Sequence, residues 1–268
     1  MKRKGFDASF FEKMRYLSFA SGSGGNCALL RGGGVNLLLD AGISMRRIRQ
    51  GLRSQGLDLE DVTGVLVTHE HTDHVSGLAM LSKYTDIPVY LSQGTAGALL
   101  REGRCAEKNL RPLPDSLTLE LGELRILGVP VSHDAVQPLG YRVEGEKSAL
   151  AVLTDLGILT EAVFSAARGC RFAVVETNHD PELLRRGPYP PALKRRILGD
   201  RGHLSNEAGA ELALCLAEAG AAEVLLGHLS RENNRPALAV STVRRRVGDA
   251  LRIAAAPPDT YSAPAELE

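Results

Sequence analysis

The chain has 268 residues, 44% of them hydrophobic, which is enough to build one large domain or two small ones around a substantial core. Its 32 basic and 32 acidic residues balance, so no overall field attracts nucleic acid and any polyanion site must be local. Four widely spaced cysteines without a Cys-x-x-Cys pair favour free thiols in a reducing compartment. We see no signal peptide and no apolar run near the ~20 residues of a membrane span, which predicts a soluble, cytoplasmic protein.

The first part of the chain reads mostly as β-strands. Residues 1–14 are polar apart from three phenylalanines, and we expect them to form a loose N-terminal extension. Apolar and β-branched stretches then predict strands over residues 15–20, 26–31, 35–39, 65–67, 87–91, 117–121, 124–131, 139–143 and 148–153. Apolar residues at helical spacing predict helices over residues 44–55, 75–84 and 93–103.

A glycine-rich turn, Ser21-Gly22-Ser23-Gly24-Gly25, separates the first two strands. Its backbone amides are suited to a phosphate-binding nest. A tight hairpin connection fits equally well, because no helix follows the turn as it does in the Walker pattern. The sequence leaves these two interpretations open.

From residue 154 the pattern changes to helices alternating with strands. Helices are predicted over residues 159–168, 205–219 and 237–251, and strands over residues 172–175 and 223–226. The tail from Ala255 carries three prolines and is expected to be disordered. We find no internal repeat motif and no interdomain linker, so we predict one catalytic domain over residues 15–253, followed by a flexible tail over residues 254–268.

The segment from Thr68 to His74 carries three of the seven histidines in the chain, with Asp73 between the last two. It follows the apolar strand 65–67 and precedes a predicted helix, so it lies in a turn at the end of a strand. Extended geometry places residues i and i+2 on the same side, so His69 and His71 can face one point. Imidazole and carboxylate groups suit zinc, manganese or iron. A polar turn with surface histidines fits each residue alone but not the dense His-x-His-x-Asp-His pattern.

Four predicted strands stop at a candidate ligand, and each ligand follows its apolar run closely: His69, His133, Asp155 and His228. A histidine or aspartate at a strand end is more often a cap or a turn residue. The shared placement favours ligands that gather at one edge of a layered sheet core, where a rigid scaffold can hold a site.

In this order the residues resemble the metallo-β-lactamase superfamily. The resemblance implies an α+β fold, an αββα sandwich of two mixed β-sheets with helices on both outer faces. It implies one metal ion held by His69, His71 and His133 and a second held by Asp73, His74 and His228, with Asp155 between them. Two divalent ions, zinc or manganese, would then supply a metal-bridged hydroxide as nucleophile. Without a thiolate, the set resembles the hydrolytic dinuclear members.

A more specific resemblance, to the YycJ/WalJ group of exonucleases with this fold, covers residues 15 to 251. It rests on motifs at residues 20–26, 68–74, 132–135, 154–157, 176–180, 187–190, 193–197, 202–206 and 228–234. It implies a metal-dependent phosphodiesterase that degrades DNA from 5′ to 3′, with a possible role and partners in mismatch repair. One departure is that Pro191 stands where the group tends to carry tryptophan, whose role is either missing or taken by Tyr189.

Residues 176–206 indicate a polyanion site on their own terms, because six basic side chains gather there in a neutral protein. A basic run is also typical of a solvated helix face. For catalysis we predict Asp73, His179 and His203, although a buried or capping role is the alternative for His179. For contacts to DNA or phosphate we predict Ser21, Ser23, Asn178, Tyr189, Lys194, Arg195, Arg196, Ser205, Asn206, Ser230, Arg231 and Asn233.

Three alternatives to a DNA exonuclease remain open. A hydrolase of a lactone, thioester or cyclic phosphodiester would use the same metals without the basic segment. An RNA nuclease would use the same fold, although we see no second substrate-binding domain. A non-catalytic nucleic-acid-binding protein is disfavoured because all seven expected ligands are present.

Overall fold

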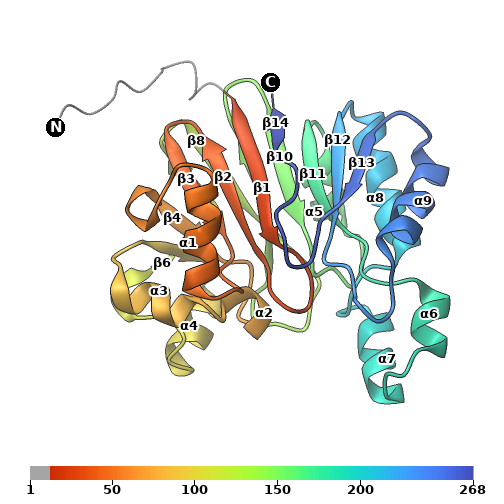
Figure 1. The fold of residues 1–268 in the computed structure, drawn as a ribbon, viewed down its shortest axis with the longest axis horizontal. Coiled ribbons are helices and arrows are strands. Elements are labelled where there is room, and N and C mark those ends of the chain that lie inside the picture. Colours follow the sequence, from red (N-terminus) through yellow and green to blue (C-terminus); the bar gives the residue numbers. More distant parts are fainter. Residues whose placement is uncertain (1–12, 268) are drawn as a thin grey trace.

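Two seven-stranded β-sheets pack face to face, and helices cover both outer faces (Figure 1). The computed structural model describes residues 13–267, so the predicted N-terminal extension lies almost entirely outside the described residues. The αββα sandwich expected from the sequence is confirmed.

Each sheet has three antiparallel pairings on one side and three parallel pairings on the other. In order across the first sheet, the strands are β14 (Ala265–Leu267), β1 (Met14–Ala20), β2 (Cys27–Gly32), β3 (Val35–Leu39), β4 (Gly64–Leu66), β5 (Val89–Leu91) and β6 (Leu110–Pro112). In the second they are β13 (Arg252–Ala255), β12 (Glu223–Gly227), β11 (Phe172–Glu176), β10 (Ala149–Leu153), β9 (Leu139–Glu144), β8 (Leu124–Pro130) and β7 (Thr118–Leu121).

The helices form two outer layers and a group near one edge of the sheets (Figure 1). The first sheet is covered by α1 (Met45–Ser54), α3 (Leu78–Tyr84) and α4 (Gln93–Arg101), and the second by α5 (Glu161–Ala167), α8 (Asn206–Glu218) and α9 (Pro236–Val247). The short helices α2 (Thr72–Val75), α6 (Pro181–Arg186) and α7 (Pro191–Leu198) lie at the lower edge in this view. Two 3₁₀ turns span Leu59–Asp61 and Glu107–Asn109.

Strand alternation explains the layers. Leu37 and Leu39 of β3 face the core between the sheets, whereas Leu38 faces the helices outside, because successive side chains point to opposite faces. The inner core also buries Tyr141, whose hydroxyl donates to the backbone carbonyl of Val67 at 2.7 Å. This buried bond anchors the strand that leads into the histidine-rich turn.

The predicted helix over residues 75–84 is wrong in detail, since the chain forms α2 and α3 with a break at Gly77. A Cβ at Gly77 would lie 2.0 Å from the carbonyl oxygen of Ile43, so only glycine allows this close approach. The Gly77 amide donates to the carbonyl of Ala41 at 2.8 Å. The break therefore docks the histidine-rich turn against the segment that follows β3.

The prediction of a flexible tail over residues 254–268 is also wrong for residues 254–267, the part that the structure describes. Ala255 ends β13, and Ala265–Leu267 form β14, which pairs with β1 at the edge of the first sheet. Ala265 and Leu267 are buried in the core between the sheets, and Ser262 exchanges hydrogen bonds with the backbone of Ser18. Three residues of β14 carry little local strand signal, so burial and edge pairing order this segment.

The predicted free thiols are confirmed for all four cysteines, none of which forms a disulfide in the structure. Among residues 13–267, no helix combines the length and the apolar character needed to cross a lipid bilayer.

Candidate metal centre

The candidate ligands gather where strands of both sheets end. The turn after β4 supplies His69 and His71, and the short helix α2 that follows it supplies Asp73 and His74. From the second sheet, His133 follows β8, Asp155 follows β10 and His228 follows β12 directly. The structure therefore brings together all seven residues that the sequence proposed as ligands, in overlapping groups that could hold metal ions.

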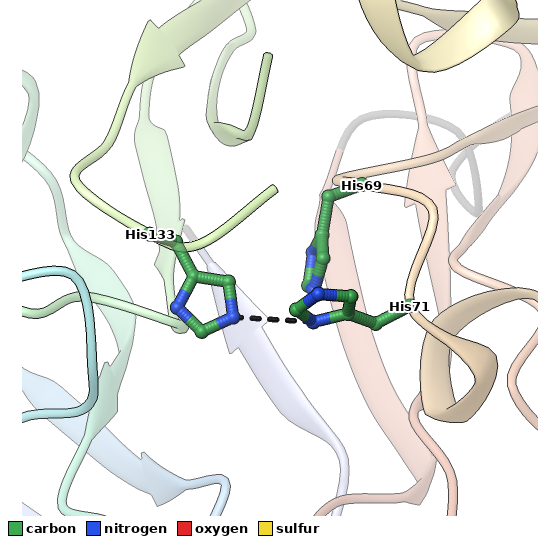
Figure 2. A group of neighbouring side chains, drawn as sticks. All are labelled: His69, His71 and His133. Carbon is green, nitrogen blue, oxygen red and sulfur yellow. Dashed lines mark hydrogen bonds between the residues drawn. The ribbon is translucent and has the colours of Figure 1, made fainter. Parts of the chain in front are cut away.

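In the first group, the rings of His69, His71 and His133 point toward one another from two facing loops (Figure 2). Nδ1 of His71 lies 3.3 Å from Nε2 of His133. Nε2 of His69 is buried and has no hydrogen-bond partner in the structure. Burial lowers the pKa of His69 well below 6.5, which keeps its imidazole neutral, the form that binds metal. An orphaned imidazole nitrogen aimed at two other rings fits a divalent ion.

The second group consists of Asp73, His74 and His228. Asp73 Oδ2 lies 3.5 Å from Nε2 of His74 and 3.6 Å from Nε2 of His228. Asp155 lies between the two groups: its Oδ1 is 3.8 Å from Nε2 of His133, and its Oδ2 is 3.3 Å from Nε2 of His74. Burial would raise the pKa of Asp155, but His228 and His74 hold it well below the usual range. The carboxylate is therefore ionised and faces both groups.

Buried acceptors orient two of these rings. Nδ1 of His74 donates to Asp40 at 2.8 Å, and Nδ1 of His133 donates to the carbonyl of Gly202 at 3.0 Å. Each bond leaves the Nε2 lone pair of its ring facing the centre, as metal-binding histidines require. Sequence reasoning gave Asp40 no role, although its position directly after β3 matches that of the other ligands. Asp40 also accepts hydrogen bonds from the amide and hydroxyl of Thr68.

Three polar residues at this edge adopt a left-handed backbone. Asp40, Asp155 and His228 have φ values of 57°, 60° and 55°. Such a conformation costs a residue other than glycine about 1 kcal/mol or more, and it persists where the surrounding structure enforces it. Here it turns each side chain toward the centre at the point where its strand ends.

Close backbone packing fixes the histidine-rich turn. A Cβ at Gly42 would lie 1.7 Å from the carbonyl oxygen of Asp73, so the chains approach here as only glycine allows. The same carbonyl accepts the amide of Asn26 at 2.7 Å, and the carbonyl of His74 accepts the amide of Ala41 at 2.9 Å. The glycine-rich segment over residues 21–25 thus acts as a hairpin connection between β1 and β2 that packs beside the centre.

His203 and Glu176 form a pair next to the ligands. Nδ1 of His203 donates to Oε1 of Glu176 at 2.8 Å. Glu176 is fully buried, and its Oε2 accepts from the amides of Leu156 at 2.7 Å and Leu204 at 3.3 Å. Both carboxylate oxygens are therefore occupied, which fits a group that orients His203 better than a metal ligand. Sequence reasoning placed Glu176 in a motif but did not assign it this role.

A pocket opens directly over these residues. Its lining includes His71, Asp73, Asp155, His203 and His228. Five residues predicted to contact DNA also line it: Ser23, Asn178, Tyr189, Arg196 and Ser230. The amide of Asn178 donates to the carbonyl of His228 at 2.9 Å, so this residue also positions a candidate ligand.

Other predicted DNA contacts do not line the pocket. On α7, Arg196 faces the pocket, whereas Lys194 and Arg195 lie on other sides of this short helix. The Lys194 ammonium group donates to the carbonyl of Arg185 at 2.7 Å. Arg231 pairs instead with Asp259 at 2.6 Å. The basic run is therefore in part a solvated helix face, the alternative that the sequence had left open.

The remaining predicted contacts support the local fold. Ser205 caps α8, and Ser21 accepts the amide of His228 at 2.9 Å. Asn206 is fully buried and exchanges two hydrogen bonds with Asn234. Asn233 is fully buried and donates through its backbone amide to Ser230. In this structure, none of these four side chains lines the pocket.

His179 does not line the pocket either, and burial lowers its pKa to about 4. The folded protein then binds a proton at this ring less tightly than the unfolded chain, so its contribution to stability is present above pH 6.5 and is lost as the pH falls toward 4. We expect His179→Gln to remove about 2 kcal/mol of the decrease in unfolding free energy between pH 7 and pH 4.5. Urea unfolding of the wild type and the variant, both with a chelator, measures this difference; equal decreases would contradict it.

Comparison with known proteins agrees with this architecture. Residues 35–229 match the model of the Beta-lactamase superfamily domain. The chain is 36% identical over 236 residues, 86% of its length and 88% of the relative's, to a protein named exodeoxyribonuclease YycJ from Bacillus anthracis. It is 35% identical over 239 residues, 88% and 89% of the two chains, to one named exodeoxyribonuclease WalJ from Streptococcus pneumoniae.

Among solved structures, the metallo-β-lactamase fold protein YhfI from Bacillus subtilis superposes with a TM-score of 0.72 at 15% identity, covering 94% of this chain and 99% of YhfI. At this identity the likeness concerns the fold alone. The family match spans the strands and turns that supply all seven candidate ligands, from β3 to the residue after His228. The chain therefore belongs to the beta-lactamase superfamily, whose two-sheet sandwich carries the residues gathered at this edge.

Proposed function

We propose that the protein is a metal-dependent exodeoxyribonuclease that hydrolyses phosphodiester bonds of DNA. The proposed direction of digestion is from 5′ to 3′. In this proposal, His69, His71 and His133 hold one divalent ion and Asp73, His74 and His228 hold a second, with Asp155 between them. Zinc and manganese both suit these ligands. A role in mismatch repair, with partners there, is part of the proposal on the strength of the motif resemblance alone.

One observation carries the proposal: the metal-ligand candidates and a cationic, aromatic wall face the same pocket. Arg196 and Tyr189 line one side, while Ser23 and Ser230 also line the pocket. A guanidinium group suits a phosphate, and a tyrosine ring offers a stacking face to a base. The names of the two relatives, which share about 35% identity over most of the chain, point to the same substrate.

The chain supplies distinct groups to the reaction. Two divalent ions bound here would activate water and neutralise charge on the phosphodiester. Asp73, a quarter exposed to the pocket, orients the attacking water. Arg196 binds a phosphate oxygen. His203 gives a proton to the leaving oxygen, and Glu176 holds the ring of His203 in position through its Nδ1.

The test is incubation of metal-stripped protein, with manganese or zinc restored, with end-labelled linear duplex DNA. Matched RNA and a generic ester are run in parallel, and an Asp73→Asn variant serves as the control. We expect stepwise loss of DNA from the 5′ end that is absent in the control. Cleavage of RNA or ester with intact DNA would overturn the substrate, and cleavage that survives in the variant would indicate a contaminant.

A further inference from the structure

Asp134 follows His133 directly, lines the pocket, and has no role in the reaction described above. Its Oδ2 accepts from Nε of Arg196 at 2.5 Å. Its Oδ1 is buried and has no hydrogen-bond partner in the structure. The ring nitrogens near Oδ1 are Nε2 of His133 at 3.4 Å and Nε2 of His71 at 3.7 Å. The Asp134 carboxylate thus lies between Arg196, which lines the pocket, and the first group of histidines.

The orientation of His71 leaves one ring nitrogen for Asp134. Nδ1 of His71 faces Nε2 of His133 at 3.3 Å, so Nδ1 points to the common centre of the first group. Nε2 of His71 then points outward. A neutral imidazole that offers Nδ1 to an ion carries its proton on Nε2 and needs an acceptor there. The other rings already have such acceptors: Asp40 accepts from Nδ1 of His74, and the carbonyl of Gly202 accepts from Nδ1 of His133.

The backbone around Asp134 is held firmly. The Ser132 hydroxyl donates to the carbonyl of Asp200 at 2.7 Å. The Arg201 guanidinium donates to the carbonyl of His133 at 3.1 Å and to that of Ala135 at 3.3 Å. These contacts join the loop after β8 to the segment after α7. They fix the backbone position from which the Asp134 carboxylate lies between His71 and Arg196.

We propose that Asp134 is a positioning residue with two functions: it fixes the ring of His71 for metal binding, and it holds the guanidinium of Arg196 against the pocket for a substrate phosphate. The proposal rests on the metal centre and substrate class proposed above. Arg196 has five N–H donors, and its pairing with Asp134 leaves others for a phosphate. Ion binding and phosphate capture then depend on the same carboxylate.

The test compares Asp134→Ala, Asp134→Asn and Arg196→Met with the wild type. Affinity for manganese and for zinc is measured by calorimetric titration of metal-stripped protein, without substrate. We expect Asp134→Ala to weaken binding of one ion about 10- to 100-fold, the usual effect of removing a partner of a metal ligand. Asp134→Asn, which keeps an oxygen acceptor, should lose less. Arg196→Met should change ion affinity less than about 3-fold, since it leaves the contact between Asp134 and His71 in place.

Steady-state kinetics with DNA test the second function, the placement of Arg196 for a substrate phosphate, separately from ion binding. Arg196→Met should raise KM about 10-fold or more with kcat nearly unchanged, because it removes a phosphate contact that is equally strong in the substrate complex and in the transition state. Asp134→Ala should impair both ion affinity and KM. Asp86→Asn, which removes another carboxylate with a basic partner, Lys108, away from the pocket, is the matched control and should change neither.

Unaltered ion affinity in Asp134→Ala would overturn the role toward His71, and unaltered KM in Arg196→Met would overturn the role toward phosphate. Thermal unfolding of the metal-free proteins checks that each variant is folded. If Asp134→Ala does not fold, ion affinity and KM are compared between Asp134→Asn and the wild type. Failure of the wild type to cleave DNA would refute the proposed function. The proposed effect of Asp134 on ion binding through His71 would still stand or fall by the calorimetric titration, because that measurement uses no substrate.

Discussion

Asp155→Asn is expected to lower the rate of DNA cleavage by about a thousandfold or more, equivalent to about 4 kcal/mol of lost transition-state stabilisation. Asp155 is 2% exposed, and its two oxygens face different groups of histidines. An asparagine has nearly the same shape but offers one oxygen and one NH₂ group. The NH₂ group would meet one of the two ion sites as a donor, so that site would lose both a negative charge and a ligand atom.

The measurement is kcat for end-labelled DNA together with metal content by mass spectrometry. We expect the variant to retain fewer ions per chain than the wild type after identical loading and dialysis. Asp249→Asn removes a fully exposed carboxylate and serves as the matched control, with expected activity and metal content equal to wild type. Full metal content and full activity in Asp155→Asn would remove this residue from the proposed centre.

The candidate centre was largely predictable because its signals are local. His69, His71 and Asp73 follow an apolar strand within a few residues, and a two-residue spacing suffices to place two rings together. The long-range candidates His133, Asp155 and His228 could be proposed because each follows an apolar strand. Asp40 shares this position after β3 and was still missed, since a single aspartate at a strand end is usually a turn residue. Its role depends on the ring of His74, 34 positions away.

The layers were predictable from strand alternation, but packing between distant segments was not. The tail was expected to be disordered because of its prolines, yet Leu267 is buried at an edge that β1 provides. The basic run gave no means of telling Arg196, which lines the pocket, from Lys194 and Arg195 beside it. That difference depends on where α7 begins and how it is oriented at the edge of the sheets beside the pocket, which composition does not encode.

The second large effect concerns the leaving group. We expect His203→Asn to lower kcat for DNA about 10²- to 10⁴-fold, the usual contribution of a positioned general acid. His203 lines the pocket, and its Nδ1 is occupied by Glu176, so its Nε2 is the nitrogen free to serve the substrate. An asparagine side chain can donate a hydrogen bond but cannot deliver a proton. KM for DNA should change little, because Arg196 and the candidate metal ligands remain.

A nitrophenyl phosphodiester of thymidine separates proton donation from binding, since its leaving group departs as a stable anion without a proton. We expect His203→Asn to lower kcat for this substrate less than about 10-fold. Equal losses with both substrates would contradict a general acid and favour a role for His203 in metal or substrate binding.

Glu176→Gln gives the companion result. The glutamine can still accept the amides of Leu156 and Leu204 through its oxygen, but its NH₂ group then faces Nδ1 of His203. That arrangement removes the acceptor that orients the ring of His203, because an NH₂ donor then faces the N–H group on Nδ1. We expect about a 10- to 100-fold loss of kcat for DNA, again with little effect on the nitrophenyl ester. The two variants together should cost little more than His203→Asn alone, because Glu176 acts through the ring that the first change removes.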